Sequence, residues 1–442
     1  MSDKERRAVT RRAFVTTSVG AAGVFALVRD LAAQGATDRP GGPPPPADAK
    51  DVPAAIRTLT PMTAGIVPIS GDERTARIEK ARRLMRDQQI GAIVLEGGSS
   101  LYYFTGVRWG NSERPFVAVI PANGDIAWVC PGFEEARARE LIHFGSDVRT
   151  WEEDESPYQR IAQIFKDRGV SRGKVGVEER LRFFIVDGIR KAAPALEFVS
   201  ADPVTAGCRM VKSPAELAIM KRANEITLAA YKAAAQTLRE GMTLQEFRSN
   251  VFAAYRALGA PEAAVLASFG KYTAFPHGST TPQRLREGDF VLVDDGCTLE
   301  GYQSDVTRTF VFGNPTPHQI DVWNLEKKAQ AAAIAAVRPG VACEAIDAAA
   351  RKVITDAGYG PGYKLPGLPH RTGHGIGIDG HEWPYLVRGN KLPLKVGMCF
   401  SDEPTITNYS EFGVRLEDCF HVTESGGEFF TVPAPSIEHP FG

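Results

Sequence analysis

Two short apolar segments lie close together near the middle of the chain. Residues 291–293 read Val-Leu-Val, apolar and polar positions alternate along residues 306–312, and Gly296 and Gly301 fall between them. This pattern predicts two antiparallel strands joined by a short loop.

Asp294 and Asp305 flank the predicted loop, eleven positions apart in the sequence. A hairpin that turns between Leu299 and Glu300 sets them opposite each other, with Cβ atoms roughly 4.5–5.5 Å apart. Carboxylates this close on apolar strands repel and lose hydration, so either one is protonated or a cation joins them. A divalent metal is the better solution if other segments supply further ligands. The alternative is a pair of loop aspartates that cap turns.

The pattern before the hairpin alternates between short strands and helices. Residues 70–89 predict a helix with one apolar face, and Asn123-Gly124 predicts a β-hairpin turn. Further helices are expected at 133–143, 158–167 and 183–192, and strands at 92–95, 116–120, 126–130, 175–177 and 196–199. Residues 70–206 therefore form a predicted α/β domain, in which no cluster of His, Cys or acidic residues indicates a site.

A second, α+β domain is expected over residues 207–442. Ser213 with Glu216, and Thr243 with Glu246, form capping boxes that begin two helices. The four predicted helices end near Leu238, Gly259, Val337 and Ala357. Because each pair of helices accompanies strands with acidic residues, the pattern suggests an internally duplicated architecture.

The N-terminal segment differs from the rest of the chain. In residues 1–36, four arginines (Arg6, Arg7, Arg11 and Arg12) precede a weakly apolar run that is too short for a convincing membrane span. The sequence Thr10 to Val15 resembles a twin-arginine export signal; the alternative is a basic tail. We therefore expect export to the periplasm or beyond, without a stable membrane anchor. Residues 37–69, rich in Pro and Gly at their start, are expected to be an extended linker.

Composition restricts the function. The 442 residues contain 52 Lys and Arg against 53 Asp and Glu, so no basic surplus indicates nucleic-acid binding. The six cysteines are scattered without a CxxC pair, which predicts free, buried thiols.

Candidate metal ligands recur in the last quarter of the chain. His374 lies among glycines, Glu403 follows a predicted strand, and alternation places Arg415 and Glu417 on the same strand face. Together with the two hairpin aspartates they supply one histidine and four carboxylates. This set suits two divalent ions such as Mn²⁺, Co²⁺, Fe²⁺ or Zn²⁺.

The order and spacing of these motifs resemble the pita-bread metallopeptidases, in the branch that includes creatinase, prolidase and Xaa-Pro aminopeptidase. The segments that carry the resemblance are FPHGSTTPQRLREGDFVLVDDG, GYQSDVTRTF, GHGIGIDGHE, DEP and VRLED. Residues 101–108, LYYFTGVR, are similar to a motif of the creatinase/prolidase N-terminal domain. The resemblance implies a pita-bread catalytic domain after a smaller creatinase-type α/β domain, and a homodimer.

By the same resemblance, Asp294 chelates one metal, Asp305 and Glu417 bridge two, and His374 with Glu403 completes the second site. Glu403 is the expected proton shuttle. The residues expected around the substrate in the proline-specific branch are His277, His370, His381 and Arg415. Thr405, where the family usually has Gly, and Asp402 depart from the pattern beside Glu403.

The expected reaction is hydrolysis of Xaa-Pro bonds, in dipeptides or at peptide N-termini, by a hydroxide that bridges two ions, with Mn²⁺ the first expectation in this oxygen-rich set. Two alternatives remain open: an exported enzyme of this fold that acts on a non-peptide substrate as a hydrolase or lyase, and a binding protein without catalysis.

The export signal can be tested directly. Replacing Arg11 and Arg12 with Lys keeps the charge but removes the twin arginines, so we expect the precursor to remain in the cytoplasm. Cell fractionation checks this, with Arg6→Lys/Arg7→Lys as the matched control. Unchanged export of the Arg11→Lys/Arg12→Lys protein would refute the signal.

Overall fold

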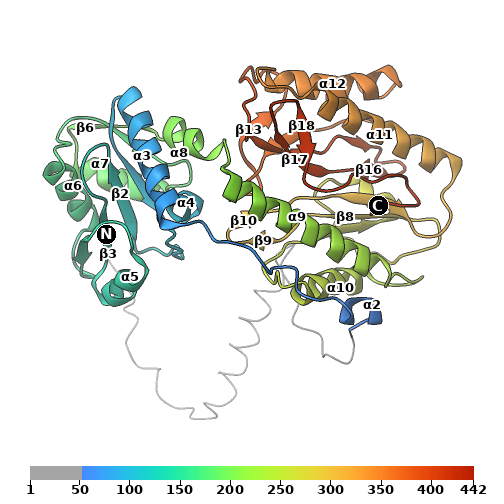
Figure 1. Cartoon of the computed structure of the whole chain (residues 1–442), viewed down its shortest axis with the longest axis horizontal. Coiled ribbons are helices and arrows are strands. Elements are labelled where there is room, and N and C mark those ends of the chain that lie inside the picture. Colours follow the sequence, from blue (N-terminus) through green and yellow to red (C-terminus); the bar gives the residue numbers. More distant parts are fainter. Residues whose placement is uncertain (1–51) are drawn as a thin grey trace, which may run out of the picture.

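The computed structural model describes residues 52–442, which form two lobes (Figure 1). The predicted export signal and residues 37–51 of the predicted linker lie outside the described residues. Within residues 52–442, no helix is both long enough and apolar enough to cross a membrane.

The N-terminal domain is a six-stranded sheet with helices packed around it. The strand order is β4-β3-β2-β1-β5-β6, with antiparallel pairing of β2 to both β1 and β3 and parallel pairing elsewhere. Its elements are β1 (Ile90–Glu96), β2 (Val117–Pro121), β3 (Ala127–Pro131), β4 (Asp147–Trp151), β5 (Gly173–Val177), β6 (Leu196–Ser200), α3 (Gly71–Asp87), α4 (Ser99–Thr105), α5 (Glu135–Leu141), α6 (Pro157–Asp167), α7 (Phe183–Ala192) and α8 (Asp202–Arg209). The predicted hairpin at Asn123-Gly124 is confirmed, with Gly124 in the left-handed region at φ 91°.

The C-terminal domain, expected from the resemblance to be catalytic, contains two helix pairs and several small sheets. Helices α9 (Pro214–Ala235) and α10 (Leu244–Ala257) pack together, as do α11 (Pro317–Ala336) and α12 (Cys343–Asp356). The predicted capping boxes at Ser213 and Thr243 are both formed. The strands are β7 (Leu266–Phe269), β8 (Phe290–Asp294), β9 (Thr298–Leu299), β10 (Tyr302–Gln303), β11 (Arg308–Val311), β12 (Gly373–Gly375), β13 (Glu382–Leu386), β14 (Cys399–Asp402), β15 (Thr405–Thr407), β16 (Gly413–Arg415), β17 (Asp418–Val422) and β18 (Gly427–Phe429).

Two of these sheets position the site. One has the order β11-β8-β7 and lies with α9 and α10; the other has the order β13-β12-β14-β17-β18 and lies with α11 and α12. A bridge between Thr307 and Glu417 joins the ends of strands from the two sheets. The arrangement agrees with the predicted pairing of each helix pair with acidic strands.

The register of the central hairpin differs from the prediction. Arg308 pairs with Val293, so Asp294 lies opposite Thr307 and not opposite Asp305. The shift arises because Glu300 and Gly301, at φ 48° and 86°, form the two-residue turn that matches the twist of the strands. Asp305 is two positions along the same strand face as Thr307, and its carboxylate still reaches the group formed by Asp294 and Glu417.

Residues 52–69 are not an extended linker, and this part of the prediction is wrong. Helix α2 (Ala54–Arg57) packs on α9 and α10, and Ile56 is 1% exposed. Farther on, the Met62 backbone N–H donates to the Leu258 carbonyl at 2.9 Å. The Pro- and Gly-rich run that predicted a linker is confined to residues 40–46. The prediction was wrongly extended from this run to the apolar residues that follow it.

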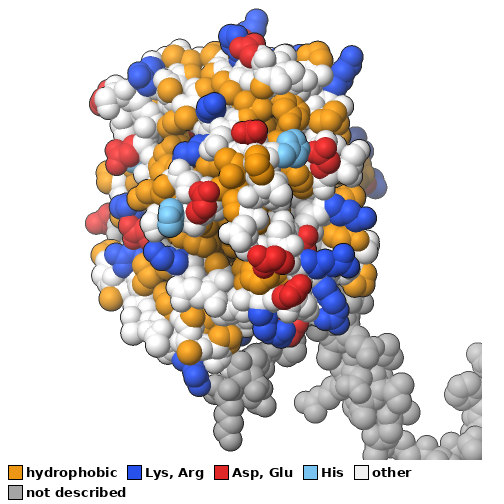
Figure 2. All heavy atoms as spheres, turned by 90° about the vertical axis from the view of Figure 1, so that its right-hand side faces the viewer, with side chains coloured by type: hydrophobic (Ala, Val, Ile, Leu, Met, Phe, Trp, Pro, Cys, Tyr) orange, Lys and Arg blue, Asp and Glu red, His pale blue; other side chains and the backbone are white. Residues whose placement is uncertain are grey.

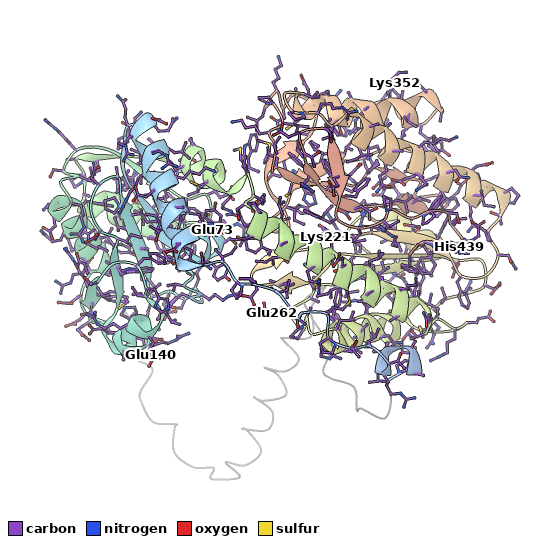
Figure 3. The ribbon with its side chains drawn as sticks, in the orientation of Figure 1. Glu73, Glu140, Lys221, Glu262, Lys352 and His439 are labelled. Atoms are coloured by element: carbon purple, nitrogen blue, oxygen red, sulfur yellow. The ribbon has the colours of Figure 1, made fainter. Side chains whose placement is uncertain are left out.

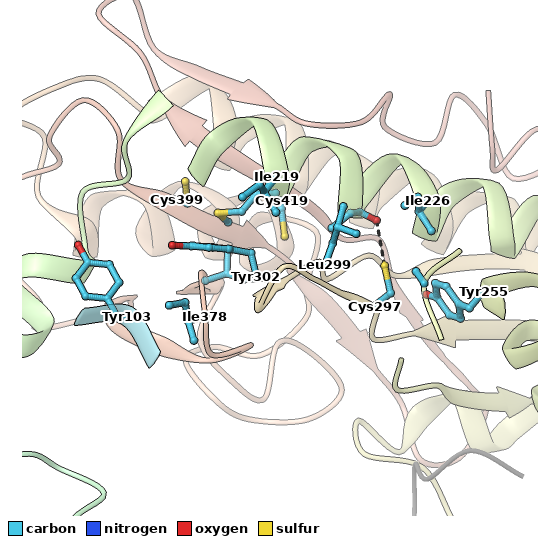
Figure 4. Packing of buried hydrophobic residues seen from close by; sticks show 14 of the residues in the cluster. Tyr103, Ile219, Ile226, Tyr255, Cys297, Leu299, Tyr302, Ile378, Cys399 and Cys419 are labelled. Atoms are coloured by element: carbon cyan, nitrogen blue, oxygen red, sulfur yellow. Dashed lines mark hydrogen bonds between the residues drawn. The ribbon is translucent and has the colours of Figure 1, made fainter. Parts of the chain in front are cut away.

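The two domains share buried polar and aromatic contacts. On α3, the Arg77 guanidinium donates to Glu73, labelled in Figure 3, at 2.6 Å. It also donates to the Tyr302 hydroxyl of the other domain at 3.0 Å. It also lies over the Tyr103 ring, 4.1 Å from its centroid. Tyr103 and Tyr302 belong to a hydrophobic cluster that continues across both domains, as Figure 4 shows, together with Cys297. The six cysteines are all buried and free, as predicted.

The face of the catalytic domain turned away from the N-terminal domain is mixed in character. Figure 2 shows basic, acidic and hydrophobic side chains interspersed over it, without a large region of one sign. This distribution follows from the nearly equal numbers of basic and acidic residues in the chain.

The packing of α2 predicts a stability effect. Ile56→Ala removes a fully buried side chain, so we expect the free energy of unfolding to fall by about 2–5 kcal/mol. Urea denaturation measures it, and Val67→Ala, at a side chain 74% exposed, is the control. Equal and small effects of the two substitutions would contradict the packing of residues 52–69.

Candidate metal centre and active site

A cavity of about 1020 Å³ opens in the catalytic domain between the two helix pairs and their sheets. All nine residues that the sequence analysis singled out line it: Asp294, Asp305, His374, Glu403, Glu417, His277, His370, His381 and Arg415. Segments separated by more than a hundred residues therefore meet at one site.

Thr307 holds two of the acidic residues at the centre of the site. Its hydroxyl lies 2.8 Å from Asp294 Oδ1 and 2.6 Å from Glu417 Oε2. Its backbone also exchanges hydrogen bonds with the backbone of Glu417, at 3.1 and 3.2 Å. The side chain of Thr307 is fully buried, so this hydroxyl, and not water, holds the two carboxylates in place.

Arg415 fixes the same group from one side. Its guanidinium pairs with Asp294 Oδ2, and its Nε donates to the Thr307 hydroxyl at 3.2 Å. It also donates to the Pro276 carbonyl at 3.3 Å, which places the neighbouring His277 at the cavity wall. Arg415 is thus a positioning residue for a ligand carboxylate as well as for the segment that carries His277.

His374 presents a nitrogen that is ready to bind a metal. Its Nδ1 lies 3.1 Å from the Gly375 carbonyl, which can only accept, so Nδ1 carries the hydrogen. The free Nε2 lies 3.3 Å from Glu403 Oε1 and 3.6 Å from Asp305 Oδ2. Burial lowers the pKa of His374 well below its usual value, so the imidazole is neutral at pH 7. This tautomer is the one that a metal ligand requires.

The ligand atoms form overlapping groups. Within each group the atoms lie within 4.8 Å of one another, and the groups are Asp294–Asp305–Glu417, His374–Glu403–Glu417 and Asp305–His374–His381. Glu417, Asp305 and His374 each occur in two groups. Glu417 Oε1 is buried and has no hydrogen-bond partner among residues 52–442, a costly arrangement that a cation relieves. The residues present therefore fit divalent metal ions.

His370 lies in the cavity wall with both ring nitrogens engaged. Its Nδ1 donates to the Arg371 carbonyl at 2.7 Å, and its Nε2 lies 3.1 Å from the Thr405 hydroxyl. Burial lowers the pKa of His370 to about 4, so Nε2 is an acceptor at neutral pH. Of the two roles expected for these histidines, donor and ring edge, His370 is therefore suited to the second, with its ring held in place by Thr405.

His381 carries its ring hydrogen on the opposite nitrogen from His370. Its Nδ1 lies 3.4 Å from Arg371 Nη2, and because a guanidinium can only donate, Nδ1 accepts. Burial, and then the charge of Arg371, lower the pKa of His381, so the ring is neutral and carries its hydrogen on Nε2. Its ring stacks on that of His374, with centroids 3.7 Å apart. His381 therefore offers an N–H next to the metal ligands.

Sequence comparisons agree with this geometry. The sequence model of metallopeptidase family M24 matches residues 218–424, and that of the creatinase/prolidase N-terminal domain matches residues 77–211. An uncharacterized peptidase of Schizosaccharomyces pombe is 36% identical over 381 residues, which cover 81% of this chain and 82% of the relative. The chain belongs to metallopeptidase family M24.

Solved structures of a dipeptidase and a prolidase resemble this M24 peptidase. The crystal structure of dipeptidase PepE from Mycobacterium ulcerans superposes with a TM-score of 0.76 at 33% identity, covering 82% of this chain and 97% of that one. A prolidase from Thermococcus sibiricus gives a TM-score of 0.75 at 31% identity, covering 81% and 97%. The predicted fold, a pita-bread domain after a creatinase-type domain, is confirmed. The M24 membership and these relatives support a metal-dependent peptidase.

Several residues of the M24 site were not predicted from the sequence. Thr307, Arg371 and Ser401 contact the ligands or the substrate-facing histidines, Ser401 through its hydroxyl 3.0 Å from the His374 backbone N–H. The alternation of Asp305 and Thr307 on one strand face was a usable signal for Thr307. Asp402, which the sequence analysis marked as a departure, does not line the cavity, and both its carboxyl oxygens are buried without a partner among the described residues.

The buried carboxyls of the M24 site have raised pKa values. Burial, followed by the neighbouring Asp294, raises the pKa of Asp305 well above its usual range. Burial, followed by Asp305, does the same for Glu417. Burial raises the pKa of Glu403 to about 7. Without bound ions, these groups hold protons at pH values where solvated carboxylates have lost them.

This predicts a pH-dependent effect of metal on stability. Between about pH 4.5 and 7 the folded, metal-free protein binds more protons than the unfolded chain, so its free energy of unfolding falls as pH rises. Bound Mn²⁺ replaces these protons, so the difference in Tm between Mn²⁺-loaded and EDTA-treated protein should widen from pH 5 to pH 7.5. Calorimetry measures it, with Asp305→Asn as the control in which the widening is reduced. A Tm difference independent of pH would contradict the assignment.

Proposed function

We propose that this M24 peptidase binds two divalent ions and hydrolyses Xaa-Pro bonds in dipeptides or short peptides. The dinuclear part rests on the sharing of ligands. Glu417, Asp305 and His374 each belong to two ligand groups. Only the two carboxylates among them have two oxygens that can bind different ions, because the hydrogen on Nδ1 leaves His374 one ligand atom. Asp305 and Glu417 would then bridge two ions, with Asp294 serving one ion and His374 with Glu403 the other. Five ligands with a single nitrogen favour a hard ion, and Mn²⁺ is our first choice.

Two such ions would polarise the substrate carbonyl and activate a water molecule for attack on its carbon. The protein's own side chains accept and donate the protons. Glu403, whose Oε1 lies 3.3 Å from His374 Nε2 among the ligand atoms, can accept a proton from the attacking water and return it to the leaving nitrogen. That nitrogen is the secondary amine of proline if the bond is Xaa-Pro.

The observation that supports proline specificity is the difference in hydrogen bonding between His370 and His381, which both line the cavity. A peptide bond to proline has no N–H, and its ring fixes φ near −65°, so its site needs a carbonyl donor and a rigid wall rather than an amide acceptor. His381 supplies a donor next to the ligands, and His370, with both nitrogens engaged, supplies a wall. His381 Nε2–H can stabilise the charge that develops on the scissile oxygen.

The relatives support the same substrate class. One of the similar solved structures is a prolidase and another is a dipeptidase, which indicates short peptides with a free N-terminus. The cavity volume of about 1020 Å³ leaves room for more than a dipeptide. We therefore include short peptides in the proposal. For location we propose export, on the strength of the twin arginines alone.

The experiment that tests this function compares substrates and one substitution. With Mn²⁺ present, we expect Ala-Pro to be cleaved much faster than Ala-Ala. His381→Ala should lower kcat/KM for Ala-Pro by about 10²–10³-fold, the usual cost of losing one transition-state donor, with bound metal unchanged. His439→Ala, an exposed histidine of the same domain that does not line the cavity (Figure 3), is the matched control.

Three results would count against parts of the proposal. Equal cleavage of Ala-Ala and Ala-Pro would remove the proline specificity while leaving the peptidase. Normal Ala-Pro hydrolysis by the His381→Ala enzyme would remove the role of His381. Elemental analysis that finds one ion or fewer per active chain would refute the dinuclear centre.

A further inference from the structure

The loop that carries His381 lies against the N-terminal domain. His381 falls between β12 and β13, and the acidic residues Asp379 and Glu382 flank it in sequence. Their side chains are only 8% and 5% exposed, whereas His381 itself is an exposed residue. Buried carboxylates on both sides of an exposed catalytic group need partners, and those partners come from outside the catalytic loop.

Asp379 is held by residues of the N-terminal domain. Its Oδ1 accepts hydrogen bonds from the Ser99 hydroxyl at 2.6 Å and pairs with Arg180 Nη1 at 2.8 Å. Its Oδ2 accepts from Arg209 Nη2 at 2.5 Å. Ser99 begins α4, Arg180 follows β5, and Arg209 ends α8, so three separate segments of that domain converge on one carboxylate.

Glu382 is held by the segment that connects the domains. Its Oε1 accepts from Lys212 Nζ at 2.6 Å, and its Oε2 contacts Arg209 Nη2. Burial acts to raise the pKa of Glu382, but Lys212 and Arg209 outweigh it, so the pKa lies below its usual value. Both flanking acids are therefore paired with cationic side chains. We call Ser99, Arg180, Arg209, Lys212, Asp379 and Glu382 the Asp379 cluster.

His381 has few contacts of its own to fix it. Its ring touches that of His374 and the Arg371 guanidinium. The backbone of its loop is further held by Gln303, whose N–H donates to the Gly377 carbonyl at 2.7 Å. Because the residues next to His381 are anchored and its side chain is not, the anchors set where the imidazole lies relative to the metal ligands.

We propose that the N-terminal domain positions His381 for catalysis through the Asp379 cluster. This inference rests on the role of His381 in the proposed function. Ser99, Arg180, Arg209 and Lys212 are positioning residues: they act on the reaction only through the loop, and none of them lines the catalytic cavity. The creatinase-type domain is then part of the catalytic apparatus rather than an independent appendage.

The test uses the full chain with the two contacts that can be removed most safely. Removing Arg209 would leave buried carboxylates unpaired and endanger folding, whereas the Arg180 side chain is 54% exposed. In Ser99→Ala/Arg180→Met, Arg209 and Lys212 still neutralise the acids. We expect kcat for Ala-Pro to fall about tenfold, since small misplacements of a catalytic group have effects of this order, while KM and bound Mn²⁺ stay unchanged.

Two matched variants serve as controls for this result. Arg190→Met removes an arginine of similar exposure, 63%, that pairs with Asp187 in the same domain but outside the Asp379 cluster, and should leave kcat unchanged. Arg180→Lys keeps a donor for Asp379 and should retain most of the wild-type kcat. A loss of kcat in Arg190→Met equal to that in Ser99→Ala/Arg180→Met would overturn the inference.

A double-mutant cycle separates positioning from a general structural effect. If the cluster acts through His381, adding Ser99→Ala/Arg180→Met to His381→Ala should lower kcat no further. The same fold-decrease in both backgrounds, an unchanged kcat in the wild-type background, or an effect on KM alone would overturn the inference while leaving the proposed function intact. If His381→Ala itself has no effect on Ala-Pro hydrolysis, the proposed role of His381 fails, and the positioning inference fails with it.

Discussion

The repulsion among buried carboxylates is the constraint on which this structure depends. Asp294, Asp305, Glu403 and Glu417 converge in one cavity, and burial together with mutual repulsion raises the pKa of Asp305, Glu403 and Glu417. The single arginine that pairs with Asp294 cannot neutralise all four. Protons or metal ions must supply the remaining positive charge, and only ions leave the carboxylates available as ligands at neutral pH.

The rest of the catalytic domain provides the rigidity that this arrangement requires. Strands β8 and β11 bring Asp294 and Thr307 together, and the bridge from Thr307 to Glu417 joins the sheets of the two halves. Around this centre, hydrogen bonds select the tautomers of the histidines. A carbonyl acceptor leaves His374 Nε2 free to bind a metal, and the Arg371 guanidinium makes His381 Nε2 a donor. The chemistry of each imidazole is therefore set by its neighbour rather than by the histidine itself.

The sequence was most informative where a pattern is local or a motif is dense. Capping boxes fixed the start of α9 and α10, and the motifs around Asp294, His374 and Glu417 predicted a shared site that the cavity confirms as a single location. The hairpin register was wrong because Glu300 and Gly301, not the midpoint between the aspartates, determine the turn. Helix α2 was missed because its burial depends on α9 and α10, which no local pattern reveals. The orientation of His370 was also beyond prediction, because it depends on Thr405, 35 positions away.

Anomalous diffraction from crystals loaded with Mn²⁺ tests the dinuclear centre most directly, because it locates the ions without reference to activity. At the Mn absorption edge, we expect two anomalous-difference peaks in the cavity. One should be contacted by Asp294, the other by His374 and Glu403, with Asp305 and Glu417 between them. A single peak, or peaks that avoid these five residues, would contradict the dinuclear centre.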